Sequence, residues 1–431
     1  MHVMVGSTCR SSIESSLFAQ FDYNVGRWSN DLRMMKDHGI DAAALNIGST
    51  ESWQQEQVKN AYDAASAVGM LVFISFDYSS FPCDAGLSVS VVKDHKDKPA
   101  QFKVDSLPMV SSFLGACIGP SGWQKIKSET GAYLMPFIEG GPQEVSGSKW
   151  SVLQSWLCWD CGWSQGDPVG NADQDRSYLN ALGSGRFATT VSPWFYIHYR
   201  TSNRCFPTNH NWLSTRWEQV IAMSKDIRFV EINTWWVGAL RSRQDAFNFS
   251  RLQERLRLGP TTSGIQPQGT TWVNNFPHTP WLEMSRYYIQ LFKTGNVPLS
   301  FNDQIYFWLR PHPKDIQASN DPLGKPAGWQ AAEDKLWAVV FCQTYGGDCN
   351  ARLTVGGTYK TFDELQPGPN KLELPLDGHS FGDVNVQVYR DGKTVIDYSP
   401  NDFSYKHSTE KCGFFVVLPP IRNLTRLDQS M

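Results

Sequence analysis

The sequence has no excess of charge of either sign and no apolar run long enough to cross a membrane. Among its 431 residues, 39 Lys and Arg stand against 42 Asp and Glu, which leaves a net charge of −3. No block of like charge stands out, so nucleic acid and membrane surfaces are poor candidate partners. The longest apolar runs, such as Met70 to Phe76 and Phe414 to Pro419, fall far short of the ~20 residues of a spanning helix. The chain does not open with a basic segment followed by an apolar one, so no signal peptide is visible.

The sequence also lacks the motifs of cofactor and metal chemistry. It contains no phosphate-binding loop, no GxSxG elbow and no GxGxxG that opens a helix. Its nine His form no HxxxH pair on an obvious helix, and Cys158 and Cys161 form a lone CxxC without a second pair at zinc spacing. We therefore predict neither a metal nor a cofactor. Cys342 and Cys349 have the spacing of a disulfide-closed hairpin in a secreted domain.

Aromatic residues are abundant, with 17 Trp, 15 Tyr and 24 Phe, or 13% of the chain. Two interpretations are open for the Trp residues. Most of them suit a Trp-rich core, whereas some can form flat platforms in a groove. The apolar face of a sugar ring stacks on such a platform while its hydroxyls bond to nearby polar groups.

The first 327 residues alternate between strand and helix patterns. Apolar runs predict buried strands at 2–5, 42–47, 70–76, 133–138, 189–196 and 229–234, with helical stripes between several of them. This order is typical of an α/β fold with a parallel sheet covered by helices. About seven or eight such units favour a (β/α)8 TIM-type barrel over an open sheet. Short strands and Gly-rich turns after Ala327 predict a small C-terminal antiparallel β domain at 328–431.

Polar side chains follow several of the predicted strands, where the catalytic residues of such barrels lie. They are Asn46, Asp77, Glu139, Asp160 and His198. Carboxylates beside aromatic residues suit glycoside hydrolysis, which needs a proton donor and a base or nucleophile next to a groove. For each carboxylate alone, a structural hydrogen bond or a helix N-cap is the competing interpretation, and both stay open at this point.

A further pair of candidates follows the apolar run 304–308. Arg310 and His312 flank Pro311, which has no N–H to continue a ladder, so a strand is expected to stop there. We expect both side chains to approach the groove from the last strand–helix loop of the barrel. Arg310 would orient a carboxylate or donate to sugar hydroxyls, and a structural salt bridge to an Asp at the rim is the alternative.

With these residues in place, the sequence resembles glycoside hydrolase family 71, the fungal α-1,3-glucanases often called mutanases. The resemblance is carried by stretches that follow one another along nearly the whole predicted barrel: His2-Val-Met-Val-Gly6, Gly39-Ile-Asp-Ala-Ala-Ala-Leu-Asn-Ile-Gly48, Phe76-Asp77, Val191-Ser-Pro-Trp-Phe-Tyr-Ile-His-Tyr199, Asn211-Trp212, Arg216-Trp217-Glu-Gln219, Val230-Glu-Ile-Asn-Thr-Trp235 and Trp308-Leu-Arg-Pro-His-Pro313. It implies a (β/α)8 barrel with a C-terminal β domain, inverting hydrolysis of α-1,3-glucan, and secretion to the medium or the cell wall.

The predicted strand ends and the resemblance together give the residues that we expect to bind substrate. They are Asn46, Glu139, Trp159, Trp194, His198, Trp235, Arg310 and His312. We expect a monomer whose partner is the α-1,3-glucan polysaccharide. Chains of the family normally begin upstream of the position of His2, so the first strand is expected to be truncated.

One departure from the family concerns catalysis. After the Thr-Trp that matches Thr234-Trp235, the family continues Asn-Asp-(Tyr or Phe)-Gly-Glu-Ser, whose Asp and Glu are the carboxylates assigned to catalysis. Here the chain continues Trp236-Val-Gly-Ala, and family-like sequence resumes near Gly259. Asp77 and Asp160 are then the remaining candidate catalytic carboxylates, although their positions match binding residues of the family.

The segment from Trp236 to Leu258 has two explanations. Glu254-Arg-Leu-Arg257 can be encoded by bases that read Asn-Asp-Tyr-Gly when shifted by one, so our hypothesis is a retained intron. The alternative is a genuine insertion, which would produce an inactive paralogue that binds glucan. The segment is rich in Arg, and we expect it to bulge from the rim rather than to form a strand of the barrel.

Overall fold

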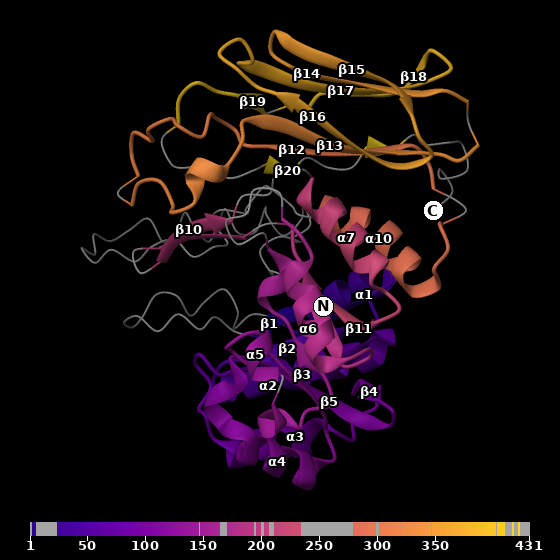
Figure 1. Ribbon diagram of the computed structural model, residues 1–431. Helices are drawn as coiled ribbons and strands as arrows, with labels where there is room; N and C mark the ends of the chain where they lie inside the picture. The colour runs from indigo at the N-terminus through magenta and orange to yellow at the C-terminus, as the bar shows by residue number, and fades with distance from the viewer. Residues whose placement is uncertain are drawn as a thin grey trace. The chain divides into compact units, whose positions relative to one another are not determined.

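The structure is a computed structural model that describes residues 2–5, 24–145, 147–163, 170–193, 195–199, 202–206, 211–233, 279–298, 301–321, 323–345, 347–401, 403–409, 416–417 and 421–422. The chain forms two compact units, which Figure 1 draws together. The first unit comprises 1–162, 171–192 and 219–237, and the second comprises 163–170, 193–218 and 238–431. No helix in the described ranges is long and apolar enough to span a bilayer.

The first unit is built on parallel strands that follow one another in chain order. They are β1 (His2–Val5), β2 (Ala42–Ile47), β3 (Leu71–Asp77), β5 (Leu107–Phe113), β6 (Tyr133–Pro136), β7 (Trp156–Leu157), β8 (Phe187–Val191) and β11 (Ile227–Ile232). Parallel ladders join β1-β2-β3-β5-β6 into one sheet and β7-β8-β11 into another. Ser155 N donates to Leu134 O at 3.1 Å, between β6 and the start of β7. The predicted α/β class is confirmed. No ladder joins β11 to β1 among the described strands, so closure into one barrel stays a prediction.

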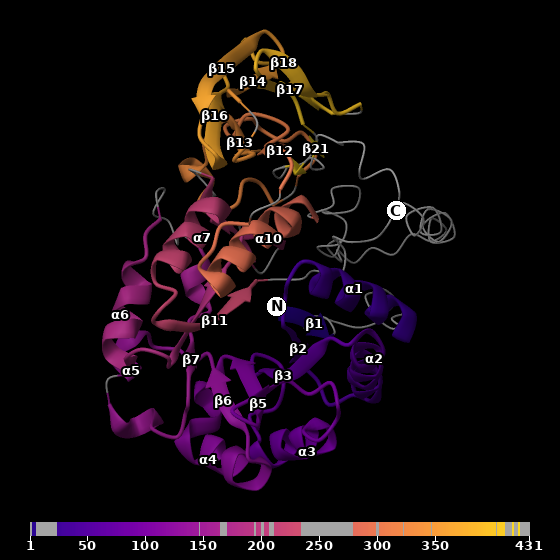
Figure 2. The same cartoon turned by 90° about the vertical axis from the view of Figure 1, so that its right-hand side faces the viewer.

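Helices connect most of these strands. They are α1 (Val25–Asp37), α2 (Ser52–Val68), α3 (Ala85–His95), α4 (Gly119–Thr130), the short α5 (Pro142–Val145), α6 (Asp173–Leu182) and α7 (Trp212–Ala222), and the short β4 (Lys103–Val104) pairs antiparallel with β5. Local signals set several ends: Asp84 accepts hydrogen bonds from two backbone N–H groups at the start of α3, and Gly69 ends α2 with φ of +66°. Figure 2 shows α1 beside α2 and α3 beside α4, outside the strands.

One apolar cluster identifies the inner face of the parallel strands. It takes residues from every parallel strand between β2 and β8, from Ala44 to Ala188, and Phe229 of β11 packs against it. Because side chains alternate between the two sides of a strand, every second residue from these points inward. The cluster therefore shows which side chains farther along each strand, toward its carboxyl end, lie on the inner face.

The second unit contains two antiparallel sheets with an apolar core between them (Figure 1). One sheet is β16 (Gly368–Pro375), β13 (Lys335–Cys342), β12 (Gln304–Leu309) and the short β20 (Val416–Val417) and β21 (Ile421–Arg422). The other is β15 (Thr358–Leu365), β14 (Cys349–Val355), β17 (Gly382–Arg390) and β18 (Lys393–Tyr398), with β19 (Ser404–Tyr405) paired to β17. The expected C-terminal antiparallel sheet is thus present.

One expectation, which concerns the strand at 304–309, is wrong. We expected it to be the last strand of the barrel, but β12 pairs antiparallel with β13 in the second unit. The reason is that a continuous apolar run looks the same for a buried parallel strand and for the central strand of a sandwich. Inner residues of β12, such as Phe307, lie in the core between the two antiparallel sheets.

Helix α10 (Thr279–Thr294) packs within the second unit against the sheet that contains β13. The ring of Tyr287 lies 5.0 Å from that of Phe341, and Trp281 meets Trp308 edge to face. The N-terminal part of α7 joins this layer, since the indole of Trp217 donates to Ser285 Oγ at 3.1 Å. A hairpin of β9 (Phe195–Tyr199) and β10 (Ser202–Phe206) also belongs to the second unit.

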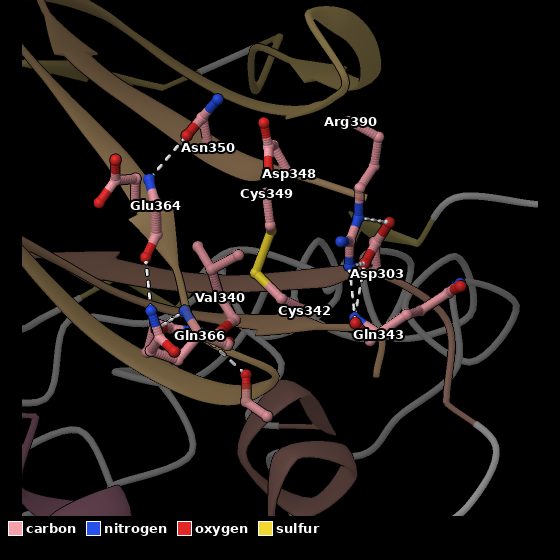
Figure 3. The surroundings of a disulfide bond; sticks show 12 residues. Asp303, Val340, Cys342, Gln343, Asp348, Cys349, Asn350, Glu364, Gln366 and Arg390 are labelled. Carbon is pink, nitrogen blue, oxygen red and sulfur yellow. Dashed lines mark hydrogen bonds and ion pairs between the residues drawn. A yellow bond between two sulfur atoms is a disulfide. The ribbon is translucent and has the colours of Figure 1, made fainter. Parts of the chain in front are cut away.

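The predicted disulfide between Cys342 and Cys349 is present, but the predicted hairpin is wrong, because the bond joins the end of β13 to the start of β14 and these strands belong to different sheets (Figure 3). Beside it, the guanidinium of Arg390 donates twice to the carboxylate of Asp303, at 2.8 and 2.5 Å. Asp303 is 2% exposed and Arg390 is 9% exposed. The turn between the two sheets is therefore fixed by a covalent bond and a buried ion pair together.

Candidate active site

The inner face of the first unit changes from apolar to polar toward the carboxyl ends of its strands. Two or four residues beyond the apolar cluster, on the same face, lie Asn46, Asp77, Thr190, Glu231 and Asn233, which we call the polar layer. All five are buried, with exposed fractions between 0% and 5%. Burial of a polar side chain makes the folded state less stable unless the side chain is hydrogen-bonded. A cluster of such side chains therefore needs an explanation, and it makes this layer the strongest candidate for a site in the unit.

Asp77 ends β3 and is held by three hydrogen bonds. Asn46 Nδ2 donates to Asp77 Oδ2 at 3.3 Å from the neighbouring β2. The backbone N–H and the hydroxyl of Ser79 both donate to Asp77 Oδ1, at 3.1 and 2.5 Å. The carboxylate is thus fixed in orientation at the end of its strand, as an acceptor of hydrogen bonds.

Glu139 follows β6 and is half-buried. Its Oε2 accepts a hydrogen bond from the backbone N–H of Ala116 at 3.0 Å, in the loop after β5. The same loop is tied to the loop after β3 by the disulfide between Cys83 and Cys117. Two neighbouring loops at the carboxyl ends of the strands are therefore joined covalently, and Glu139 binds to one of them.

Trp159 and Asp160 lie in a closed turn after β7. The CxxC that encloses them forms a disulfide between Cys158 and Cys161. Thr190 Oγ1 of β8 lies 3.0 Å from the carbonyl oxygens of both Cys158 and Trp159. The half-buried indole of Trp159 packs against Phe113, with ring centroids 4.8 Å apart. This turn holds an aromatic ring and a carboxylate in fixed positions next to the polar layer.

The negative charge of Asp160 also affects the pKa of the neighbouring Tyr178. Burial, and second the negative charge of Asp160, raise the pKa of Tyr178 to about 12. Tyr178 is 1% exposed and lies on α6. The phenol therefore stays neutral at physiological pH.

The remaining predicted residues do not add to this group. Trp194 and Trp235 lie outside the described residues. His198 is part of β9, a strand of the antiparallel hairpin in the second unit, and not the end of a parallel strand. Of the predicted residues, the structure thus brings Asn46, Asp77, Glu139, Trp159 and Asp160 to the carboxyl ends of the parallel strands of one unit.

Arg310 and His312 lie in the second unit, after the antiparallel β12, and are 9% and 5% exposed. Arg310 forms an ion pair with Asp334 at 3.6 Å and donates to the carbonyl of Glu333 at 3.1 Å. Burial lowers the pKa of both Arg310 and His312. The expectation that both residues follow a barrel strand is therefore wrong. The alternative for Arg310, a structural salt bridge, is supported by its ion pair with Asp334.

Sequence reasoning passed over Glu231 and Asn233, although both lie in a stretch that carries the family resemblance. They are 5% and 1% exposed, on the inner face of β11 and directly after it. The signal that could have found them is the spacing of two in Glu231-Ile-Asn233, which places both side chains on one face. Within the described ranges, no three His, Cys, Asp or Glu side chains gather in a way that could hold a metal ion.

Comparison with known proteins shows which sequences and structures the chain is similar to. The profile of the family described as "Glycosyl hydrolase family 71" matches residues 16–415. The chain is 29% identical to glucan endo-1,3-alpha-glucosidase agn1 of Schizosaccharomyces pombe, over 91% of this chain and 88% of that protein. It is 27% identical to mutanase Pc12g07500 of Penicillium rubens, over 89% of this chain and 84% of that protein. Among solved structures, a GH99 endo-alpha-mannosidase covers 63% of this chain and 85% of its own, with 10% identity and a TM-score of 0.44.

Proposed function

The chain belongs to glycosyl hydrolase family 71, and on this premise we propose that it acts on α-1,3-glucan. Two relatives that align along most of the chain bear the names glucan endo-1,3-alpha-glucosidase and mutanase. The observation that carries the proposal is the rigid turn after β7, which holds Trp159 and Asp160 next to a buried polar layer. An aromatic platform beside hydrogen-bonding groups is the arrangement that binds a sugar ring.

We place the glucan at the carboxyl ends of the parallel strands, in a barrel closed between β11 and β1. One glucose ring stacks on Trp159, and Asn46, Asp77 and Glu139 bond to its hydroxyls. In an inverting reaction, one carboxyl group protonates the leaving oxygen while another activates a water on the opposite side of the ring. Such a pair needs a separation of ~6.5–9.5 Å to leave room for the water. Asp77 and Asp160 are the candidates for this pair in the present sequence.

The missing Asp and Glu after Trp235 favour a second candidate function, which is binding of glucan without hydrolysis. Loss of a general acid or base costs about 10²–10⁴-fold in rate for each group. Asp77 already accepts three hydrogen bonds, which suits a residue that orients substrate. We therefore expect the sequence as it stands to bind α-1,3-glucan and to release little or no sugar.

The test uses insoluble α-1,3-glucan and follows both pull-down of the protein and release of reducing ends. A second version carries Asn-Asp-Tyr-Gly-Glu-Ser after Trp235 and lacks Trp236 to Leu258. The unmodified chain should be retained by the polymer, and only the restored version should release sugar. An α-1,4-linked glucan is the control polymer, and equal retention by both polymers would contradict the assigned linkage. Equal hydrolysis by the two versions would instead make Asp77 and Asp160 the acid and base.

The family relatives also suggest where the protein acts. We propose that it works outside the cell or in the cell wall, where its polysaccharide is found. The three disulfides of the described residues fit an oxidising compartment. Fractionation of the producing cells into medium, wall and cytosol, followed by immunoblotting, would contradict this location if the protein stayed in the cytosol.

A further inference from the structure

Within the part of the chain that the structure describes, the side-chain amide of Asn233 has no hydrogen-bond partner. Its Nδ2 and Oδ1 atoms are both buried, and neither is paired within the described residues. The residue is 1% exposed. Its backbone is well fixed, because the N–H of Asn233 donates to Val191 O at 2.9 Å and continues the pairing of β11 with β8. The unpaired amide therefore sits on a rigid strand end.

An unpaired buried amide makes the folded state less stable. It gives up its hydrogen bonds to water and receives none from the protein. An apolar side chain of the same size would avoid this loss at the same position. A ligand that binds to the folded protein can supply the hydrogen bonds that such a buried polar group lacks.

The position of Asn233 indicates what that partner is. It lies on the inner face, two residues beyond Glu231, in the polar layer that also contains Asp77 and Asn46. An amide offers two donors on Nδ2 and an acceptor on Oδ1. Adjacent hydroxyls of a sugar can accept from the first and donate to the second, so they satisfy both ends of the amide at once.

We propose that Asn233 binds two hydroxyl groups of one glucose unit and fixes its orientation in the polar layer. The class of ligand rests on the proposed function, and the assignment adds the residue that positions the sugar. Asn233 exchanges no proton in the reaction. It is a positioning residue, and its contribution is to binding.

The experiment replaces Asn233 by Leu, which has nearly the same shape and no polar atoms. The readouts are calorimetric titration with a soluble α-1,3-linked gluco-oligosaccharide and the melting temperature of the full chain without ligand. We expect Asn233→Leu to weaken binding about tenfold or more, which is the loss of one or two well-made hydrogen bonds. We expect the same substitution to raise the melting temperature, because it removes two unpaired buried groups.

The matched control is Gln101→Met in the same unit. Gln101 is a buried amide whose groups are satisfied by Tyr62, Phe102 and Met109. Its replacement should lower the melting temperature and leave sugar affinity unchanged. The two substitutions are thus expected to shift the melting temperature in opposite directions, and only Asn233→Leu should weaken sugar binding.

Several results would overturn the proposal. Unchanged affinity in Asn233→Leu would remove Asn233 from the binding site, while binding by the unaltered chain would leave the proposed function intact. A lower melting temperature, with or without a loss of affinity, would show that the amide has a structural partner such as a bound water. Absence of sugar binding by the unaltered chain would instead contradict the proposed function itself, and the ligand assigned to Asn233 with it.

Discussion

The buried ion pair between Asp303 and Arg390 gives a sharp prediction for the stability of the second unit. Arg390 donates to both oxygens of Asp303 and to the carbonyl of Gln343 at 3.2 Å (Figure 3). It also donates to the carbonyl of Gly347 at 2.7 Å. The N–H of Gln343 adds a further bond to Asp303 at 2.9 Å. Asp303→Ala leaves a buried guanidinium with two carbonyls but without a counter-charge.

The magnitude follows from this geometry. Removal of one member of a buried ion pair costs about 3–5 kcal/mol, because the remaining charge stays buried without compensation. For a unit of this size, that loss corresponds to a fall of about 6–20 °C in its melting temperature. Replacement of both residues, as in Asp303→Leu with Arg390→Met, removes the uncompensated charge and should recover most of the loss.

The assay is calorimetric unfolding of the full chain for Asp303→Ala, Asp303→Leu, Arg390→Met and the double variant, and the last three form one thermodynamic cycle with the unaltered chain. We expect the transition of the second unit to shift and that of the first unit to stay in place. A single-variant loss below about 1 kcal/mol would put the pair in the range of solvent-exposed ion pairs. A double variant no more stable than Asp303→Ala would also refute the reasoning, because it would show that the lost contacts, and not the isolated charge, set the cost.

Three further predictions concern binding and folding. Trp159→Ala should weaken retention on α-1,3-glucan at least about fivefold in a pull-down titration, while Trp159→Phe keeps part of the platform; equal retention by all three proteins would remove Trp159 from the site. Cys83→Ser with Cys117→Ser opens a loop with a sequence separation of 34 and should cost about 4 kcal/mol by chain entropy; a denaturant midpoint that does not move would contradict this. Burial lowers the pKa of His312 below its usual 6.5, so the unfolded chain takes up the proton first and stability should fall as pH drops below about 6.5. His312→Gln should reduce the slope of melting temperature between about pH 7.5 and about pH 5.5, and an unchanged slope would argue against a buried neutral imidazole.

Most of the parallel strands could be predicted because they are short continuous apolar runs. The strands β5 and β7 were missed, since β5 contains Ser111 and Ser112 and β7 has only two residues. The run 42–47 became β2 without a shift of either end, and its core residues are completely or nearly buried. The run 304–309 carries the same signal, yet it became the centre of a sandwich. A continuous apolar run indicates that a strand is buried on both faces, but it does not indicate with which other strand that strand pairs.

The candidate site was predictable only where a polar residue interrupts such a run. Asp77 at the end of an apolar strand gave a clear signal, and the structure places it in the polar layer. Glu231 and Asn233 gave a weaker one, because Arg228 and Glu231 make β11 look only partly apolar. The disulfide between Cys83 and Cys117 carried no local signal, since a long-range pairing depends on the fold and not on the spacing.

The central claim is that the carboxyl ends of the parallel strands in the first unit bind α-1,3-glucan. A crystal structure of the chain with a soluble α-1,3-linked gluco-oligosaccharide tests it most directly. The account predicts a glucose ring stacked on Trp159, with its hydroxyls within hydrogen-bond distance of Asp77 and Asn233. An oligosaccharide bound only to residues of the second unit would contradict the account.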